Sequence, residues 1–177
     1  SGFQTWIFPD VCPTPLLAFT VNYLAADVGI MVTASHNPAI DNGYKVYLGG
    51  SADGIEYRGS QIISPTDTLI AKEILAVKKI GERGNKWQVI DDEIVERYIE
   101  KTSRLAKGNQ DLKIVYTAMH GVGKQVFLNL FNKSGFYKTY NKPLLLNLKE
   151  INLSQYCIMC SLYSFGTISL RYAFHFD

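Results

Sequence analysis

Two short apolar runs most constrain what this chain can fold into. Residues 28–34 read VGIMVTA and residues 112–118 read LKIVYTA, and both are rich in β-branched side chains. Runs of this kind are typical of strands that are covered on both faces of a sheet. A polar loop follows each run, and segments with helical periodicity lie between the two. This alternation predicts an α/β fold.

Three helices are expected before residue 108. The first begins at Thr14, which we expect to act as a hydroxyl N-cap, with Pro15 at the first helical position. The second covers residues 67–79, and the third begins at Asp91 or Asp92. The inward stripes are formed by apolar residues at helical spacing: Leu69, Ile70, Ile74 and Val77 in the second helix, and Ile94, Val95, Tyr98, Ile99 and Leu105 in the third.

A Lys-Gly-Asn-Gln-Asp stretch at residues 107–111 is the best candidate for a domain boundary. After it, a strand, a glycine turn at residues 120–123 and a helix over residues 124–133 form the opening unit of a fresh α/β domain. The chain is therefore expected to divide into three parts: residues 1–107, residues 112–136, and a tail of residues 137–177 that is left unassigned.

Charge and composition argue against several classes of partner. The net charge is only +2, with 18 basic and 16 acidic residues interspersed, so no nucleic-acid partner is expected. Residues 151–170 carry no charge, but their serines, threonine and asparagine make them too polar for a membrane span, and we expect them to be strand-prone. The N-terminal residues do not have the pattern of a signal peptide.

The three cysteines are Cys12, Cys157 and Cys160. An odd count of this kind indicates a reducing compartment, so we expect a cytoplasmic location. Cys157 and Cys160 form a single CxxC pair. A metal or redox role stays open for the pair, but two small apolar side chains are the preferred interpretation, because a zinc site needs two more ligands at matching spacing.

The loop after the first apolar run, residues 33–43 (TASHNPAIDNG), carries the most promising chemistry. A strand of a parallel sheet would place this loop at its carboxyl end, where open α/β folds bind ligands. Ser35 offers a hydroxyl that can accept and donate a phosphoryl group, and His36 and Asn37 offer donors beside it. The Asp-Asn-Gly turn folds the next strand back, which we expect to bring Lys45 close to Ser35 as a positive charge or a proton carrier.

Simpler roles for the same residues stay open. Ser35 can cap a turn, His36 can be a surface residue, and Lys45 can protect an edge strand from pairing. The loop can also bind phosphate without any chemistry, since hydroxyls and backbone N–H groups suit oxyanions.

Longer stretches of the sequence resemble a known family. "TASHNP" followed by "NGYKVY" resembles the phosphoserine loop of the α-D-phosphohexomutases, the phosphoglucomutase/phosphomannomutase family. Three further segments resemble the family in the same order: "PTPLLAFTV", "GSQIISPTDTLIAKEI" and "KIVYTAMHGVG". The resemblance covers residues 11–136 and looks most like the branch that holds phosphopentomutase-type and some bacterial phosphomannomutase-type members.

The resemblance implies a partial three-layer α/β/α domain I, followed by the first βα unit of domain II. It also implies a mutase that converts a sugar 1-phosphate to a 5- or 6-phosphate through a phosphoserine at Ser35, with a hexose or pentose phosphate as partner and a sugar bisphosphate as activator. His36 and Lys45 match family positions that assist proton transfer or orient the substrate, and the Ser35 phosphate would be a ligand of Mg²⁺. Further positions would bind substrate or phosphate: Thr33, Asn37, Asn42 and His120. For His120, a capping or core role stays open.

Several features of the family are missing from this sequence. It has no Thr-x-Gly-Ile/Leu-Arg-Gly segment, no Asp-Gly-Asp-x-Asp-Arg loop to hold Mg²⁺, and no sugar-selecting or phosphate loop of the later domains. We therefore expect impaired mutase turnover, with a non-catalytic phosphosugar-binding remnant of a disrupted gene as the alternative. The family pattern stops after Phe136, where an altered reading frame and a degenerate continuation of domain II both stay open. Neither the sugar nor the oligomeric state is predicted.

Overall fold

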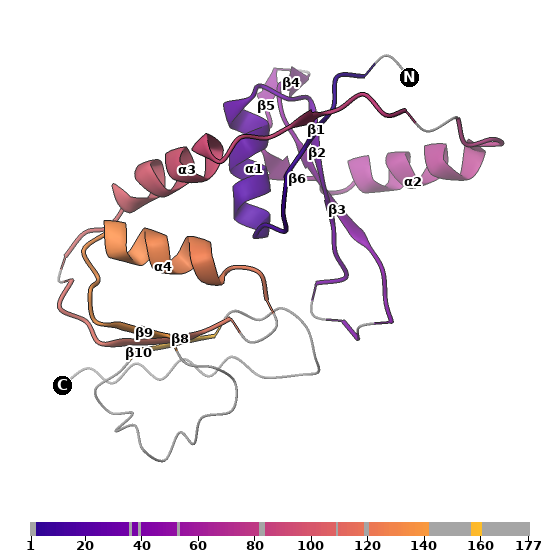
Figure 1. Cartoon of the computed structure of the whole chain (residues 1–177). Helices are drawn as coiled ribbons and strands as arrows, with labels where there is room; N and C mark the ends of the chain where they lie inside the picture. The colour runs from indigo at the N-terminus through magenta and orange to yellow at the C-terminus, as the bar shows by residue number, and fades with distance from the viewer. Residues whose placement is uncertain are drawn as a thin grey trace. The chain divides into compact units, whose positions relative to one another are not determined.

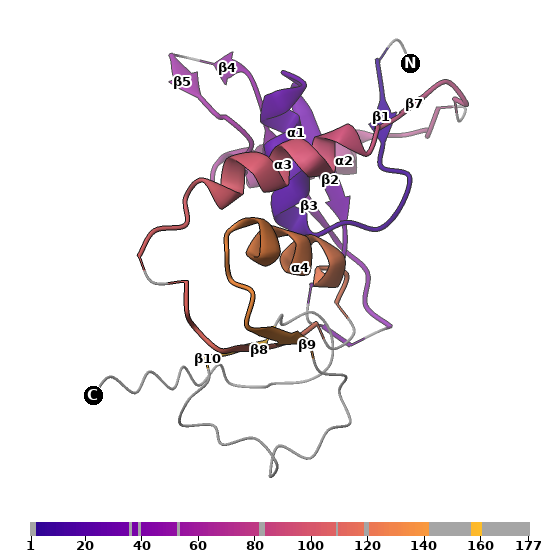
Figure 2. The same cartoon turned by 60° about the vertical axis from the view of Figure 1, so that its left-hand side comes forward.

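The computed structural model describes most of the chain. The described residues are 3–35, 37–38, 40–52, 54–81, 84–108, 110–118, 121–141 and 157–160. The chain divides into two compact units: Ser1–Thr33 with Tyr44–Ile94, and Ala34–Gly43 with Val95–Asp177. Figures 1 and 2 show the elements of each unit in two views. No helix within the described ranges is long and apolar enough to cross a membrane.

A three-stranded sheet forms the centre of the first unit. β2 (Val28–Val32) pairs antiparallel with β3 (Tyr44–Leu48), and β3 pairs antiparallel with β6 (Ser60–Gln61). The strand order is therefore β2-β3-β6. This mixed α/β arrangement agrees with the fold class predicted from the sequence.

One helix, α1 (Thr14–Tyr23), packs on one face of this sheet (Figure 1). Leu17 and Val21 of α1 form a buried cluster with Tyr47 of β3. The helix approaches β2 closely because Gly29 has no side chain: a Cβ atom at this position would lie 2.3 Å from Val21 Cγ2. A glycine is therefore required where the helix crosses the strand.

The expectation that β2 is a strand of a parallel sheet, covered on both faces, is wrong. β2 pairs antiparallel and lies at one edge of its sheet. Gly29 is buried, whereas Val28, Ile30 and Val32 are 48%, 58% and 73% exposed. The physical reason is that the chain turns straight back into β3, and α1 covers only the face on which Gly29 lies.

Two helices also differ from the sequence-based expectation. α1 begins at Thr14 itself, after Pro13, and no side chain caps it, so Thr14 is not the N-cap. α2 (Thr66–Ala76) ends earlier than predicted and buries none of its residues. Its expected inward residues Leu69 and Ile74 are 58% and 52% exposed, so the predicted inward stripe is wrong for the structure as described.

Two small sheets of two strands complete the first unit. β4 (Ser51–Ala52) pairs antiparallel with β5 (Ile55–Glu56). β1 (Trp6–Ile7) pairs parallel with β7 (Gln88–Val89), and this pair joins segments that lie far apart in the sequence. Side chains at and before the β1–β7 pair enclose a surface hollow.

The second unit is built around a parallel sheet. β8 (Ile114–Thr117) lies between β9 (Thr139–Asn141) and β10 (Cys157–Cys160) and pairs parallel with both. The first three residues of β8 are buried, so the prediction of a covered strand is confirmed here. The prediction that the uncharged tail forms a strand is confirmed for β10.

α4 (Lys124–Lys133) has the bounds that the sequence predicts. Its Phe127 ring stacks on Tyr116 of β8 with 3.7 Å between ring centroids, and on Phe131 at 4.0 Å. Phe136 lies tilted against Phe131, with 5.3 Å between the ring centroids. This row of aromatic rings holds α4 against β8 and makes the pair a βα unit.

α3 (Glu93–Ser103) begins close to the predicted position. Ile94 and Ile99 are buried, as their helical spacing predicts, but Leu105 lies beyond the end of the helix and is 74% exposed. The domain boundary expected at residues 107–111 stays a prediction. The two compact units group residues that pack together, and each unit combines two separate stretches of sequence, so they do not test where one domain ends and the next begins.

Candidate functional site

The candidate loop is the connection between β2 and β3. Val32 pairs with Tyr44 across the ladder, so residues 33–43 leave and return at the same end of the two strands. The prediction that the Asp-Asn-Gly turn folds the next strand back is confirmed. The structure describes five of the expected site residues: Thr33, Ser35, Asn37, Asn42 and Lys45. His36 and His120 lie outside the described residues, so their roles stay predictions.

Ser35 has an uncommon backbone conformation. Its φ is +59°, in the left-handed region, where a non-glycine residue costs ~1–3 kcal/mol. The backbone N–H of Asn37 donates to the carbonyl of Ala34 at 3.1 Å, which closes a tight turn with Ser35 at its first central position. Ser35 is half-buried. Strain of this kind clusters at functional loops, so the geometry points to Ser35 as the residue that this turn presents.

A second turn leads from Pro38 back toward β3. The backbone N–H of Asp41 donates to the carbonyl of Pro38 at 2.9 Å. The side-chain oxygen of Asn42 then accepts from the N–H of Gly43 at 2.9 Å, so part of this amide is used to shape the turn. Asn37 and Asn42 are both exposed, and their amide nitrogens are suited to donate hydrogen bonds to phosphate oxygens.

Lys45 is the second residue of β3 and pairs with Met31 of β2. Side chains alternate along a strand, so Lys45 lies on the same face as Tyr47, the face that α1 covers. The Lys45 side chain is half-buried. Ser35 and Lys45 fall in different compact units, so their expected proximity stays a prediction.

A cysteine thiolate and a bound metal ion are two alternatives to the serine hydroxyl as the reactive group. Burial raises the pKa of the Cys12 thiol to about 11, which keeps it protonated and weakly nucleophilic near neutral pH. Within the described residues, no group of three or more His, Cys, Asp or Glu side chains is placed to hold a metal ion. These residues therefore do not supply a ligand set for the expected Mg²⁺, and the hydroxyl of Ser35 is the candidate group for transfer chemistry.

The residues that match known sequences include the serine loop. Residues 1–81 match the family model of the phosphoglucomutase/phosphomannomutase alpha/beta/alpha domain I. The "Probable phosphomannomutase" of Haemophilus influenzae is 46% identical over 140 residues, which cover 76% of this chain and 28% of that protein. The human phosphopentomutase is 34% identical over 151 residues, which cover 74% of this chain and 22% of that protein. The chain thus spans less than a third of the length of these relatives.

Comparison with solved structures supports the fold. The crystal structure of a protein described as a phosphomannomutase from Thermus thermophilus superposes with a TM-score of 0.62. The superposition covers 80% of this chain and 30% of that one, at 23% sequence identity. At this identity the likeness supports the shared fold and nothing finer.

Proposed function

Residues 1–81 belong to the phosphoglucomutase/phosphomannomutase family as a domain I, and from this premise we propose that Ser35 is the phosphoryl carrier of a phosphosugar mutase. One observation supports the proposal most: Ser35 stands at the corner of a tight turn in the left-handed conformation, within the TASHNP segment. A carrier has to present its oxygen repeatedly in the same position, and a turn that holds its backbone meets that need.

The proposed reaction has two transfers. A sugar monophosphate hydroxyl attacks the phosphorus of phospho-Ser35, the P–Oγ bond breaks, and the serine oxygen takes up a proton while a sugar bisphosphate forms. After the bisphosphate reorients, the Ser35 hydroxyl gives up its proton and attacks the other phosphoryl group. The bond between that phosphorus and the sugar oxygen breaks and the sugar oxygen takes up a proton, which releases the isomeric sugar monophosphate and restores phospho-Ser35. The reacting oxygens lie in line with the phosphorus in such transfers, so positioning and charge stabilisation provide most of the catalysis.

The other expected residues have supporting roles in this proposal. Lys45 provides a positive charge for the phosphoryl oxygens, and the side chains of Thr33, Asn37 and Asn42 donate hydrogen bonds to substrate or phosphate. His36 and His120 keep the roles expected from the sequence. The described residues offer no cluster of three or more His, Cys, Asp or Glu side chains to hold Mg²⁺.

The substrate is proposed to be a hexose or pentose phosphate, with a sugar bisphosphate that charges Ser35. Relatives with 46% and 34% identity are named for phosphomannose and phosphopentose conversion, which supports this class of substrate and leaves the sugar open. We expect the 177-residue polypeptide on its own to turn over substrate slowly. Its described residues offer no metal-binding cluster that would stabilise the negative charge on the transferring oxygens.

The experiment is to incubate the purified chain with glucose 1,6-bisphosphate carrying labelled phosphate, and to follow label on the protein. We expect about one phosphoryl group per chain in the wild type and in Ser60→Ala, a matched serine control outside the loop, and none in Ser35→Ala. Label in Ser35→Ala at the wild-type level would overturn the proposal. Saturable binding of the bisphosphate that is lost in Ser35→Ala, without any label in the wild type, would instead support a non-catalytic phosphosugar-binding remnant.

A further inference from the structure

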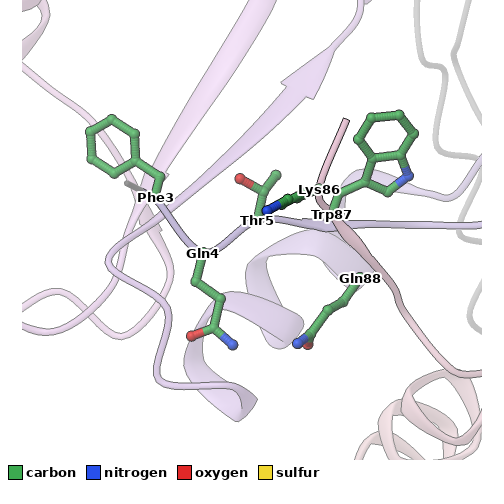
Figure 3. A pocket seen from close by; sticks show the side chains of 6 residues that line it. All are labelled: Phe3, Gln4, Thr5, Lys86, Trp87 and Gln88. Carbon is green, nitrogen blue, oxygen red and sulfur yellow. The ribbon is translucent and has the colours of Figure 1, made fainter. Parts of the chain in front are cut away.

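A surface hollow of about 470 Å³ lies beside the β1–β7 pair in the first unit (Figure 3). It is lined by residues at the N-terminal ends of both strands: Phe3, Gln4, Thr5, Lys86, Trp87 and Gln88. Its volume falls within the ~300–1,000 Å³ that is usual for small-molecule sites. None of these residues belongs to the serine loop.

The backbone of the two strands fixes the relative position of the lining residues. The N–H of Gln88 donates to the carbonyl of Thr5 at 2.9 Å, and the N–H of Ile90 donates to the carbonyl of Ile7 at 2.9 Å. Trp6 pairs with Gln88 in the parallel register. The residues before these positions are therefore held side by side, although more than eighty positions separate them in the sequence.

The apolar part of the hollow consists of two exposed aromatic rings. Phe3 is 82% exposed and Trp87 is 50% exposed. Both rings project to the same side of the strand pair, the side to which Thr5 also points (Figure 3). An aromatic ring offers a flat apolar face on which the C–H face of a sugar ring can stack. Large apolar groups gathered at the surface often mark a binding site.

The polar part of the hollow suits an anion with hydroxyl groups. The Lys86 ammonium is an exposed point charge that can bind a phosphate. The side-chain amides of Gln4 and Gln88 both point to the opposite side of the strand pair (Figure 3), and each amide can donate and accept hydrogen bonds. Thr5 adds a hydroxyl beside the rings. Flat apolar faces, one cation and the Thr5 hydroxyl together match a hydroxylated ring that carries a phosphate, whereas the two glutamine amides lie on the side away from the rings.

We propose that this hollow binds a phosphorylated sugar, at a site that does not use Ser35. The ring stacks on Trp87 or Phe3, the phosphate contacts Lys86, and Thr5, on the same side as the rings, binds a hydroxyl group of the sugar. Such a site would bind a sugar phosphate whether or not Ser35 transfers a phosphoryl group, so the two proposals can be tested separately.

The test uses the fluorescence of Trp87 in the full 177-residue chain. The chain has two tryptophans, Trp6 and Trp87, so Trp6→Phe leaves Trp87 as the reporter. In this background we expect mannose 1-phosphate to change the emission in a saturable manner, whereas mannose and inorganic phosphate are expected to bind at least tenfold more weakly. Lys86→Gln should weaken binding roughly tenfold, as expected for loss of a charge-assisted contact. Lys133→Gln, an exposed lysine of the second unit, should leave the affinity unchanged.

Three results would overturn the proposal. One is the lack of a saturable change with mannose 1-phosphate and with ribose 5-phosphate. Another is equal binding of inorganic phosphate, or tighter binding of adenosine monophosphate, which would assign the hollow to a simple anion or a nucleotide. The third is loss of binding in Ser35→Ala, which would place the sugar in the serine loop; unchanged binding in this variant keeps the two proposals separate.

Discussion

β2 and β8 have nearly the same sequence pattern, but they differ in how much of each strand is buried. Each is a short β-branched run that precedes a polar loop, but β8 buries its first three residues, Ile114–Tyr116, whereas β2 leaves Val28, Ile30 and Val32 exposed. β8 lies between two parallel strands, while β2 lies at the edge of an antiparallel sheet. The pattern therefore indicates a strand in both places, and the neighbours in space decide how much of it is covered.

The largest expected effect uses the same residue type in both strands. Ile114 is 3% exposed and Ile30 is 58% exposed. We expect Ile114→Ala to lower the free energy of unfolding by ~2–5 kcal/mol, because it leaves a cavity in the core. Ile30→Ala should change it by about 0.5 kcal/mol or less. Urea unfolding followed by circular dichroism measures both, and equal losses would break the comparison.

The next prediction tests the one buried position of β2. A Cβ atom at Gly29 would lie 2.3 Å from Val21 Cγ2, so Gly29→Ala should cost ~1–3 kcal/mol as α1 is forced away from the strand. Gly81→Ala is the matched control, because no atom lies within 4 Å of the added methyl group. If Gly29→Ala unfolds at the same urea concentration as the control, α1 does not cover β2 as described.

A smaller effect is expected in the loop that follows β2. Glycine adopts the left-handed conformation of Ser35 without steric cost, whereas alanine does not. We expect Ser35→Gly to be more stable than Ser35→Ala by about 1 kcal/mol. The comparison is made between two variants that both lack the hydroxyl, so loss of a serine contact affects each alike. An alanine variant as stable as the glycine variant would mean that the turn is not strained.

The smallest effect concerns Lys45, which pairs with Met31 of β2. Lys45→Met removes the charge and keeps an apolar side chain on the covered face of β3. We expect it to weaken binding of mannose 1-phosphate about threefold to fivefold, as for one partly solvated ion pair, and to leave the stability nearly unchanged. Calorimetric titration in a Lys86→Gln background, with mannose as the neutral reference, measures the difference. Equal loss for both sugars would give Lys45 a role in the fold alone.

The parts of the structure that could be predicted from sequence are those that local chemistry decides. The bounds of α4, the strand at β8 and the turn back into β3 follow from glycine positions and from apolar periodicity. The exposed stripe of α2 could not be predicted, because a helical pattern does not tell which element covers it. The exposed face of β2 could not be predicted for the same reason, because an apolar run does not tell which of its faces another element covers.

Some features of the candidate site can likewise be predicted from the sequence, and others cannot. The TASHNP segment and its serine stand out in the sequence, and the return of the chain toward Lys45 follows from the Asp-Asn-Gly turn. The left-handed backbone of Ser35 has no sequence signal, since serine rarely adopts it. The hollow at Trp87 has no sequence signal either, because the pairing of β1 with β7 joins distant segments of two residues each.

The central claim is that Ser35 carries a phosphoryl group and gives it to a sugar phosphate. The most direct measurement is a single-turnover experiment: the chain is charged with labelled phosphate, freed of the donor, and mixed with mannose 1-phosphate or ribose 1-phosphate. The account predicts that peptide mapping places the label on Ser35, and that the label leaves the protein and appears in a sugar bisphosphate. Label that maps to another residue, or that stays on Ser35 and is released only as inorganic phosphate, would contradict the account.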